Sequence, residues 1–118
     1  MNKIQLYNKR EESISLLDRR CLQNNKKNTV IFGKGESIDH AKKKLEFCYY
    51  LHKKGKQFYT EAIFKSGGEA DIFVLDDKIA VEILKSEPES SIIKKKLNYP
   101  CMVVEVRMNQ SFEEIFGD

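Results

Sequence analysis

The sequence predicts an α/β fold in which helices flank a mixed central β-sheet. Three runs rich in β-branched and aromatic residues, at 57–64, 69–75 and 79–84, are separated only by short turns, which is typical of an antiparallel meander. Segments with helical spacing precede and follow this meander. A nearly continuous apolar run at 101–108 comes after the second helical segment, and a strand that follows a crossover helix tends to lie parallel to an earlier strand.

The two flanking helices have recognisable ends. The first is expected to begin near Glu36 or Ser37 and to stop at Gly55, since glycine commonly ends helices. Its expected core stripe is Ile38, Ala41, Leu45, Cys48 or Tyr49, and Leu51 or His52. In the second helix Ser86 could be the cap and Pro88 fits the first turn. Its expected core residues are Ile92, Ile93, Leu97 and Tyr99.

The length of 118 residues suits a single domain, residues 1–118. Residues 34–107 form its predicted core, residues 1–33 an N-terminal extension, and residues 108–118 a short C-terminal helix that begins at Asn109 or Ser111. Within the extension, residues 10–23 predict one amphipathic helix with Ile14, Leu17 and Cys21 on one stripe, and "TVIF" at 29–32 predicts a strand.

Composition narrows the class of protein. No apolar run approaches the roughly 20 residues that cross a membrane, and the N-terminus lacks a signal-peptide apolar region, so no membrane partner and a cytoplasmic location are expected. Three widely spaced cysteines without a CxxC pair indicate free thiols. The net charge is +3, with lysines and arginines in clusters and acidic residues concentrated between 61 and 89. A basic surface around an acidic centre suits a nucleic-acid enzyme, although solvated lysine-rich helices explain the charge more simply.

Two carboxylates stand in the most strand-like part of the sequence. If the turn is centred between Asp76 and Asp77, residues whose numbers sum to 153 lie opposite each other, which pairs Asp71 with Glu82. Facing carboxylates repel, and a divalent cation such as Mg²⁺ or Mn²⁺ would compensate. The alternative is that both carboxylates lie on a solvated face or pair with lysines.

Further carboxylates could join or replace this pair. Glu36 and Glu61 could be additional ligands, and Glu69 could take the place of Asp71 in another register.

Together, the acidic residues and the element order resemble the PD-(D/E)XK nuclease superfamily, whose fold is called restriction-endonuclease-like. The family core is a helix, a three-stranded meander, a helix and a strand (αβββαβ). Its signature has an acid on the second strand and, about ten residues later, an acid, a spacer and a lysine. Here "EADIFVL" supplies Asp71, and "AVEILKSE" supplies Glu82 and Lys85. "GESIDH" offers Glu36, and the compact layout is similar to archaeal Holliday junction resolvases.

The resemblance implies a metal-dependent DNA endonuclease that is structure-selective or weakly sequence-specific. Asp71, Glu82, Glu36 and a backbone carbonyl near Ile83 would hold Mg²⁺ or Mn²⁺, and Lys85 would steady the attacking hydroxide or the transition-state charge. The substrate could be branched or single-stranded DNA, and a homodimer would match the resolvases. The expected DNA-backbone contacts are Lys42, Lys43, Lys44, Lys53, Lys54, Lys56, Lys94, Lys95 and Lys96.

One departure from the family keeps other functions open. The family lysine would fall at Leu84, and Lys85 reaches the face of Glu82 only if the strand bulges. Ala70 also stands where the family has a proline-type residue before the first acid. A nuclease-fold protein that only binds nucleic acid or a protein partner is therefore an alternative, and a structural protein is a third.

Overall fold

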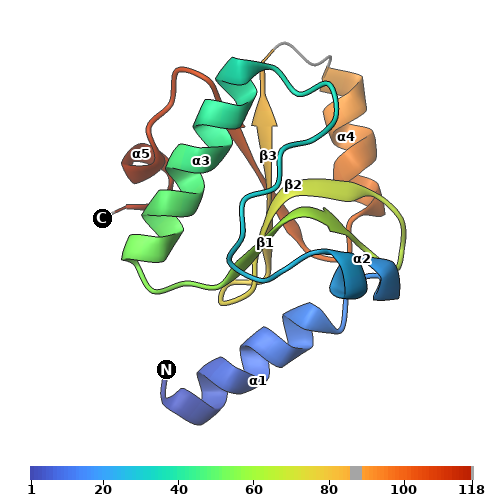
Figure 1. Cartoon of the computed structure of the whole chain (residues 1–118), viewed down its shortest axis with the longest axis vertical. Coiled ribbons are helices and arrows are strands. Elements are labelled where there is room, and N and C mark those ends of the chain that lie inside the picture. The colour runs from blue at the N-terminus through green and yellow to red at the C-terminus, as the bar shows by residue number, and fades with distance from the viewer. Residues whose placement is uncertain (86–88, 118) are drawn as a thin grey trace.

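The computed structural model describes residues 1–85 and 89–117, without the side chains of residues 89–92 and 95. Four strands form one sheet in the order β1-β2-β3-β4 (Figure 1), and they span β1 Phe58–Ile63, β2 Glu69–Val74, β3 Ile79–Leu84 and β4 Met102–Arg107. The first three strands pair antiparallel, and β4 is parallel to β3. The predicted mixed sheet is confirmed, and each strand begins and ends within one residue of its predicted bounds.

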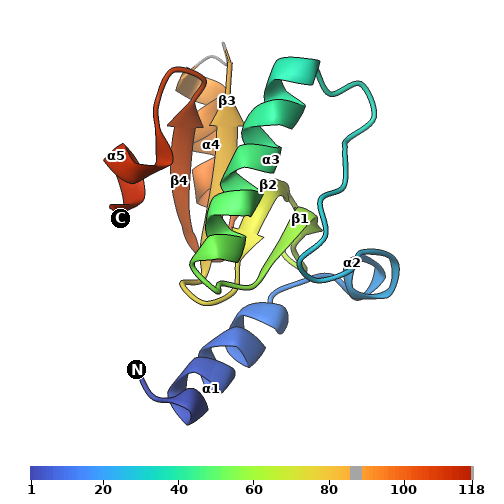
Figure 2. The ribbon, with the colours of Figure 1, turned by 60° about the vertical axis from the view of Figure 1, so that its left-hand side comes forward.

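Helices cover both faces of this sheet. Figure 2 shows α3 (Ile38–Lys53) in front of the sheet and α4 (Glu89–Asn98) behind it. Short α5 (Phe112–Phe116) packs on α3 through aromatic rings, and the Phe47 and Phe112 rings meet edge to face with centroids 4.6 Å apart. In the described part of the chain no helix is both long and apolar enough to cross a membrane.

The ends of α3 were predicted correctly, but its buried face only in part. Ser37 is the N-cap, its Oγ accepting from the His40 N–H at 3.1 Å, and Gly55 follows with a φ of +71°. The buried residues are Lys44, Phe47, Cys48 and Leu51. By contrast, the predicted core residues Ile38 and Leu45 are 70 and 51% exposed, and of the alternatives Cys48 and Tyr49 it is Cys48 that is buried. A buried lysine therefore lies inside the face that an apolar stripe was expected to fill.

A buried tyrosine, Tyr99, directly follows helix α4. Tyr99 is buried as predicted, whereas Ile93 and Leu97 are 53 and 80% exposed, so their assignment to the core was wrong. The single buried ring after the helix anchors this end, and the apolar residues of the last two turns face outward. The predicted cap Ser86, the first-turn Pro88 and the side chain of Ile92 lie outside the described residues.

The predicted single helix at 10–23 is two helices, α1 (Lys3–Ile14) and α2 (Arg19–Asn24). The break occurs because Leu17 forms a β-bridge with Phe64, where the Asp18 N–H donates to the Ile63 carbonyl at 2.8 Å. Pairing with the sheet therefore outcompetes helix propensity at this point. Leu17 and Cys21 are buried, as the predicted stripe required.

The predicted strand at 29–32 is absent, and its backbone is instead joined to β1 through side chains. Thr60 Oγ1 accepts from the Ile31 N–H and donates to the Thr29 carbonyl, both at 2.8 Å. Asn28 takes a φ of +61°, which breaks the extended geometry that a ladder needs. The segment still occupies the outer edge of β1.

The Phe64–Glu69 turn offers a test of packing against Tyr99. Gly67 and Gly68 have φ values of +95° and +88°, so any substitution strains the backbone at both. A Cβ on Gly68 would lie 2.6 Å from the Tyr99 ring, while one on Gly67 meets nothing within 4 Å. We expect Gly67→Ala to cost about 1 kcal/mol and Gly68→Ala to cost about 1–3 kcal/mol more, measured by urea unfolding. Equal destabilisation by the two variants would contradict this packing.

Candidate functional site

In the adjacent strands β1 and β2, the alternation of side chains between the two sheet faces is interrupted at paired positions. Tyr59 and Ala62 pack into one core cluster although they are three residues apart, and Ala70 and Phe73 do the same on β2. In regular strands such pairs would face opposite sides of the sheet. The pairing of Thr60 with Ile72 and of Ala62 with Ala70 places the irregular residues, Glu61 and Asp71, opposite each other. Glu61 has a φ of +50°, so the kink turns both acidic residues out of the regular alternation.

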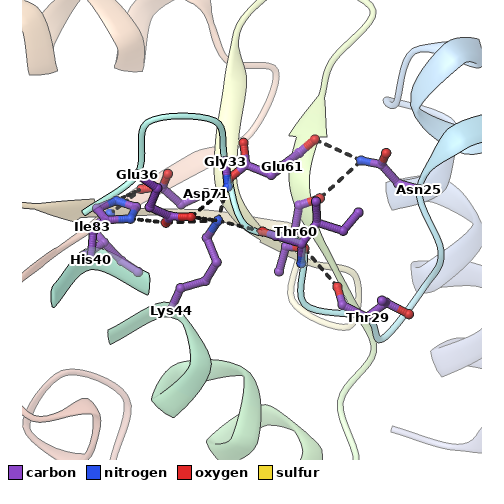
Figure 3. Close-up of polar contacts among 11 residues, drawn as sticks. Asn25, Thr29, Gly33, Glu36, His40, Lys44, Thr60, Glu61, Asp71 and Ile83 are labelled. Carbon is purple, nitrogen blue, oxygen red and sulfur yellow. Dashed lines mark hydrogen bonds and ion pairs between the residues drawn. The ribbon is translucent and has the colours of Figure 1, made fainter. Parts of the chain in front are cut away.

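Both acidic residues meet a polar stripe on α3 and the loop before it (Figure 3). Glu36, His40 and Lys44 are spaced four residues apart, so they project from one side of the helix. The His40 Nδ1 contacts Glu36, and its Nε2 lies 3.3 Å from the Asp71 carboxylate. Lys44 forms ion pairs with Glu36, at 3.1 Å, and with Glu61. The stripe thus joins α3 to β1 and β2 through charged contacts.

Lys44 is fully buried, and its ammonium also donates to the Ile31 carbonyl at 2.9 Å. Burial alone would lower the pKa of Lys44, but the Glu61 and Glu36 carboxylates outweigh burial and raise it. Burial has the opposite effect on an acid, and on its own it would raise the pKa of Glu36. Hydrogen bonds from the Gly33 N–H, at 2.7 Å, and from His40 and Lys44 hold the pKa of Glu36 below its ordinary value. The network is therefore charged within the fold.

Asp71 lies between two polar neighbours, one on β3 and one on α3. One of its oxygens accepts from the backbone N–H of Ile83 at 2.7 Å, and the same oxygen lies near His40. The His40 ring therefore has one nitrogen at the Glu36 carboxylate and the other at the Asp71 carboxylate. Asp71 therefore connects the α3 stripe to β3 directly beside Glu82.

Glu82 was predicted to lie across from Asp71, and the register supports this position. Ile72 pairs with Val81 and Phe73 with Ala80, so paired numbers sum to 153 as predicted. The Glu82 side chain is buried, and Tyr99 Oη contacts its Oε1 while donating to the Glu69 carbonyl at 2.6 Å. Burial, then Glu82, raises the pKa of Tyr99, which remains a neutral phenol.

No bulge brings Lys85 to the face of Glu82. The pairing of β3 with β4 runs without interruption from Ile79 to Leu84, and Leu84 is buried. Lys85 is exposed and lines a surface hollow with Asp39 and Lys42 of α3. Lys85 is therefore on the α3 side of the sheet, the side that Asp71 reaches through the phase change.

In the described part of this region, four acidic side chains surround two basic ones. Glu36, Glu61, Glu69 and Asp71 are joined by contacts or electrostatic coupling to His40 and Lys44. The Glu61 carboxylate and burial raise the pKa of Glu69 to about 7. No three His, Cys, Asp or Glu side chains in residues 1–85 and 89–117 are placed to hold a metal ion. The cluster is therefore acidic, and the described side chains form no preformed metal cage.

The predicted DNA-contacting lysines fall into three groups. Lys44 was assigned wrongly, because it is buried and paired inside the fold. Lys56 and Lys96 form ion pairs with Asp77 and Glu105, and Lys43 donates to the Gln110 carbonyl. The remaining described members are exposed at the surface: Lys42, Lys53, Lys54 and Lys94. The side chain of Lys95 lies outside the described residues.

Sequence reasoning identified Asp71, Glu82 and Glu36 but gave Lys44 the wrong role and treated Tyr99 only as a packing residue. The four-residue spacing of Glu36, His40 and Lys44 was the available signal. Comparison with models of protein families, with curated proteins and with solved structures finds no significant match.

Lys44→Met tests the buried network. Removing the ammonium leaves Glu36 and Glu61 without their shared cation, and we expect a loss of about 3–5 kcal/mol in the free energy of unfolding at neutral pH. Exposed Lys42→Met is the matched control and should change little.

The stability difference between wild type and Lys44→Met should also depend on pH in a defined direction. The wild-type pKa of Glu36 is lowered on folding, so its contribution is present above the ordinary glutamate pKa and is lost as the pH falls through the lowered value. The gap between wild type and Lys44→Met should therefore narrow in acid. A pH-independent gap, or no gap, in urea unfolding would refute the network.

Proposed function

We propose that the protein is a metal-dependent endonuclease that hydrolyses DNA phosphodiester bonds, built on an αβββαβ core of the restriction-endonuclease-like type. The observation that carries this proposal is the meeting of Asp71 with the backbone of Ile83, beside Glu82, within an excess of carboxylates. The order α3, β1, β2, β3, α4, β4 is the order that such a core requires. We further expect the enzyme to work in the cytoplasm.

The donor set suits Mg²⁺ or Mn²⁺, since hard divalent cations take carboxylate and carbonyl oxygens. Asp71, Glu82 and the Ile83 carbonyl would hold the ion, and Glu36 or Glu69 would complete or orient its shell. The raised pKa of Glu69 supports this fit, because a cation would remove the repulsion that now favours its protonated form. A bound ion would polarise the scissile phosphate and lower the pKa of the attacking water.

The protein's own groups would do the remaining work. Lys44 would fix Glu36 and Glu61 in place, and His40 would orient Asp71. Exposed Lys85 at the end of β3 would contact the DNA phosphate from the α3 side. Hydrolysis then needs a water molecule as nucleophile and releases one sugar oxygen as leaving group.

A second function, nucleic-acid binding without cleavage, is favoured by two specific observations. Buried Leu84 occupies the position of the family lysine, and Lys44 already neutralises two of the carboxylates. In that case the charged network would serve stability, and the lysines of α3 would serve binding.

A homodimer also stays a prediction. Strand β4 lies at the sheet edge, with Met102 67% exposed, and its outer backbone groups could pair with a second copy. Light scattering would measure the mass in solution.

Cleavage decides between the two functions. Labelled duplex, single-stranded and branched DNA should be cut with Mg²⁺ or Mn²⁺, and chelation by EDTA should stop the reaction. Asp71→Asn should reduce the cleavage rate more than about 100-fold. Losing a residue that only supports a metal ligand typically costs about 10- to 100-fold, and Asp71 is proposed as a ligand itself. Asp77→Asn, at the β2–β3 turn and paired with Lys56, is the matched control and should cut normally.

Absence of cutting on every substrate would reject the nuclease, and salt-dependent binding in its place would select the second function. Cutting that survives Asp71→Asn would show that the site is wrong.

A further inference from the structure

Three surface hollows lie along α3, and the first two adjoin each other. The first, of about 390 Å³, is lined by Lys85 at the end of β3 and by Lys42 on α3. The second, of about 570 Å³, shares Lys43, Glu46 and Met108 with the first and extends to Tyr49. The third, of about 460 Å³, begins on the other side of Tyr49 and ends near Lys56. We call the surface lined by these three hollows the α3 groove.

Tyr49 stands where the second and third hollows meet. Its side chain is 60% exposed, although it belongs to a helix whose other large aromatic residues pack against α5. The Lys53 ammonium lies 5.8 Å from the ring centroid, so a cation accompanies the aromatic surface. Lys42, Glu46, Tyr49 and Lys53 are spaced to follow one outward stripe of the helix.

The charge of the groove is positive. Its lining includes five lysines, Lys42, Lys43, Lys53, Lys56 and Lys85, against three acids, Asp39, Glu46 and Glu113. Lys56 is already paired with Asp77 outside the groove, which leaves a smaller positive excess. A lysine-lined path with an exposed aromatic ring is the combination that holds a single nucleic-acid strand, in which phosphates meet cations and an unpaired base stacks.

We propose that the α3 groove holds a single strand of DNA, with an unpaired base stacked on Tyr49. This inference rests on the proposed function and deepens it, because it names an unpaired strand as part of the substrate. Lys42 and Tyr49 are seven residues apart in the helix, a rise of roughly 10 Å, which matches about three nucleotides of a stacked strand. A strand that leaves the site near Lys85 would therefore place a base on Tyr49 a few nucleotides away. Fully paired DNA presents no free base face to this ring.

Binding in EDTA tests the inference without cleavage. Fluorescently labelled oligothymidylate should bind Tyr49→Ala about 5- to 150-fold more weakly than wild type, the cost of losing one base stack. Tyr49→Phe keeps the aromatic face and should bind like wild type. Tyr7→Ala is the matched control, because Tyr7 is 62% exposed on α1 and lines none of the three hollows. Blunt duplex should bind all four proteins alike.

A direct reporter is available because the chain contains no tryptophan. Tyr49→Trp should bind oligothymidylate, and its fluorescence should be quenched on stacking. An oligonucleotide of abasic sites should bind more weakly and quench little. Lys53→Glu should weaken binding and reduce its salt dependence, whereas Lys27→Glu, in the exposed loop before α3, should do neither.

The failures are distinguishable. If Tyr49→Ala binds oligothymidylate as tightly as wild type, or if Tyr49→Trp binds without quenching, the groove inference is overturned while Asp71-dependent cutting of duplex still supports the nuclease. If no DNA of any form is bound or cut, both the inference and the proposed function are rejected.

Discussion

The ion pairs of one buried lysine organise the candidate site. Lys44 can remain charged inside the fold only because Glu36, Glu61 and the Ile31 carbonyl surround its ammonium. These partners come from the loop before α3 and from β1, so one side chain fixes three segments relative to each other. The same contacts require Glu61 to leave the regular strand geometry, and Asp71 departs from the alternation at the paired position on β2. The position of Asp71 beside Ile83 is thus linked, through Glu61 on β1, to the buried Lys44 ammonium.

Alternation and turn geometry predicted the sheet well. Two short turns leave little freedom in the register of the meander, and the sum of 153 for paired residues of β2 and β3 followed from the Asp76–Asp77 turn alone. The ends of α3 were equally local, since Ser37 and Gly55 act within one turn of the helix. These features depend on contacts between residues close in sequence, which a single sequence displays directly.

Long-range contacts account for what the sequence did not reveal. A lysine on a helix is ordinarily solvated, so apolar spacing put Leu45 in the core and Lys44 on the surface, the reverse of the structure. The break before α2 depends on pairing of Leu17 with Phe64, 47 residues later. The sequence left open whether β3 bulges after Glu82. Strand β3 is regular, and the change of phase lies instead at Glu61 and Asp71.

The charge balance gives the cluster two opposing properties. Lys44 and His40 satisfy part of the negative charge, which stabilises the fold, while the remainder leaves Glu61 and Glu69 repelling each other. We propose that a divalent metal ion would neutralise this remaining negative charge.

Titration of the Glu69 carboxyl by carbon-13 NMR tests this claim most directly. The account predicts a pKa of about 7 against an ordinary 4.5, so wild type loses stability relative to Glu69→Gln as the pH rises through that window. Glu61→Gln should lower the pKa of Glu69, since it removes the main cause, and Mg²⁺ should lower it in wild type. A carboxyl that titrates near 4.5, or a raised pKa that Mg²⁺ leaves unchanged, would contradict an uncompensated acidic cluster that binds metal.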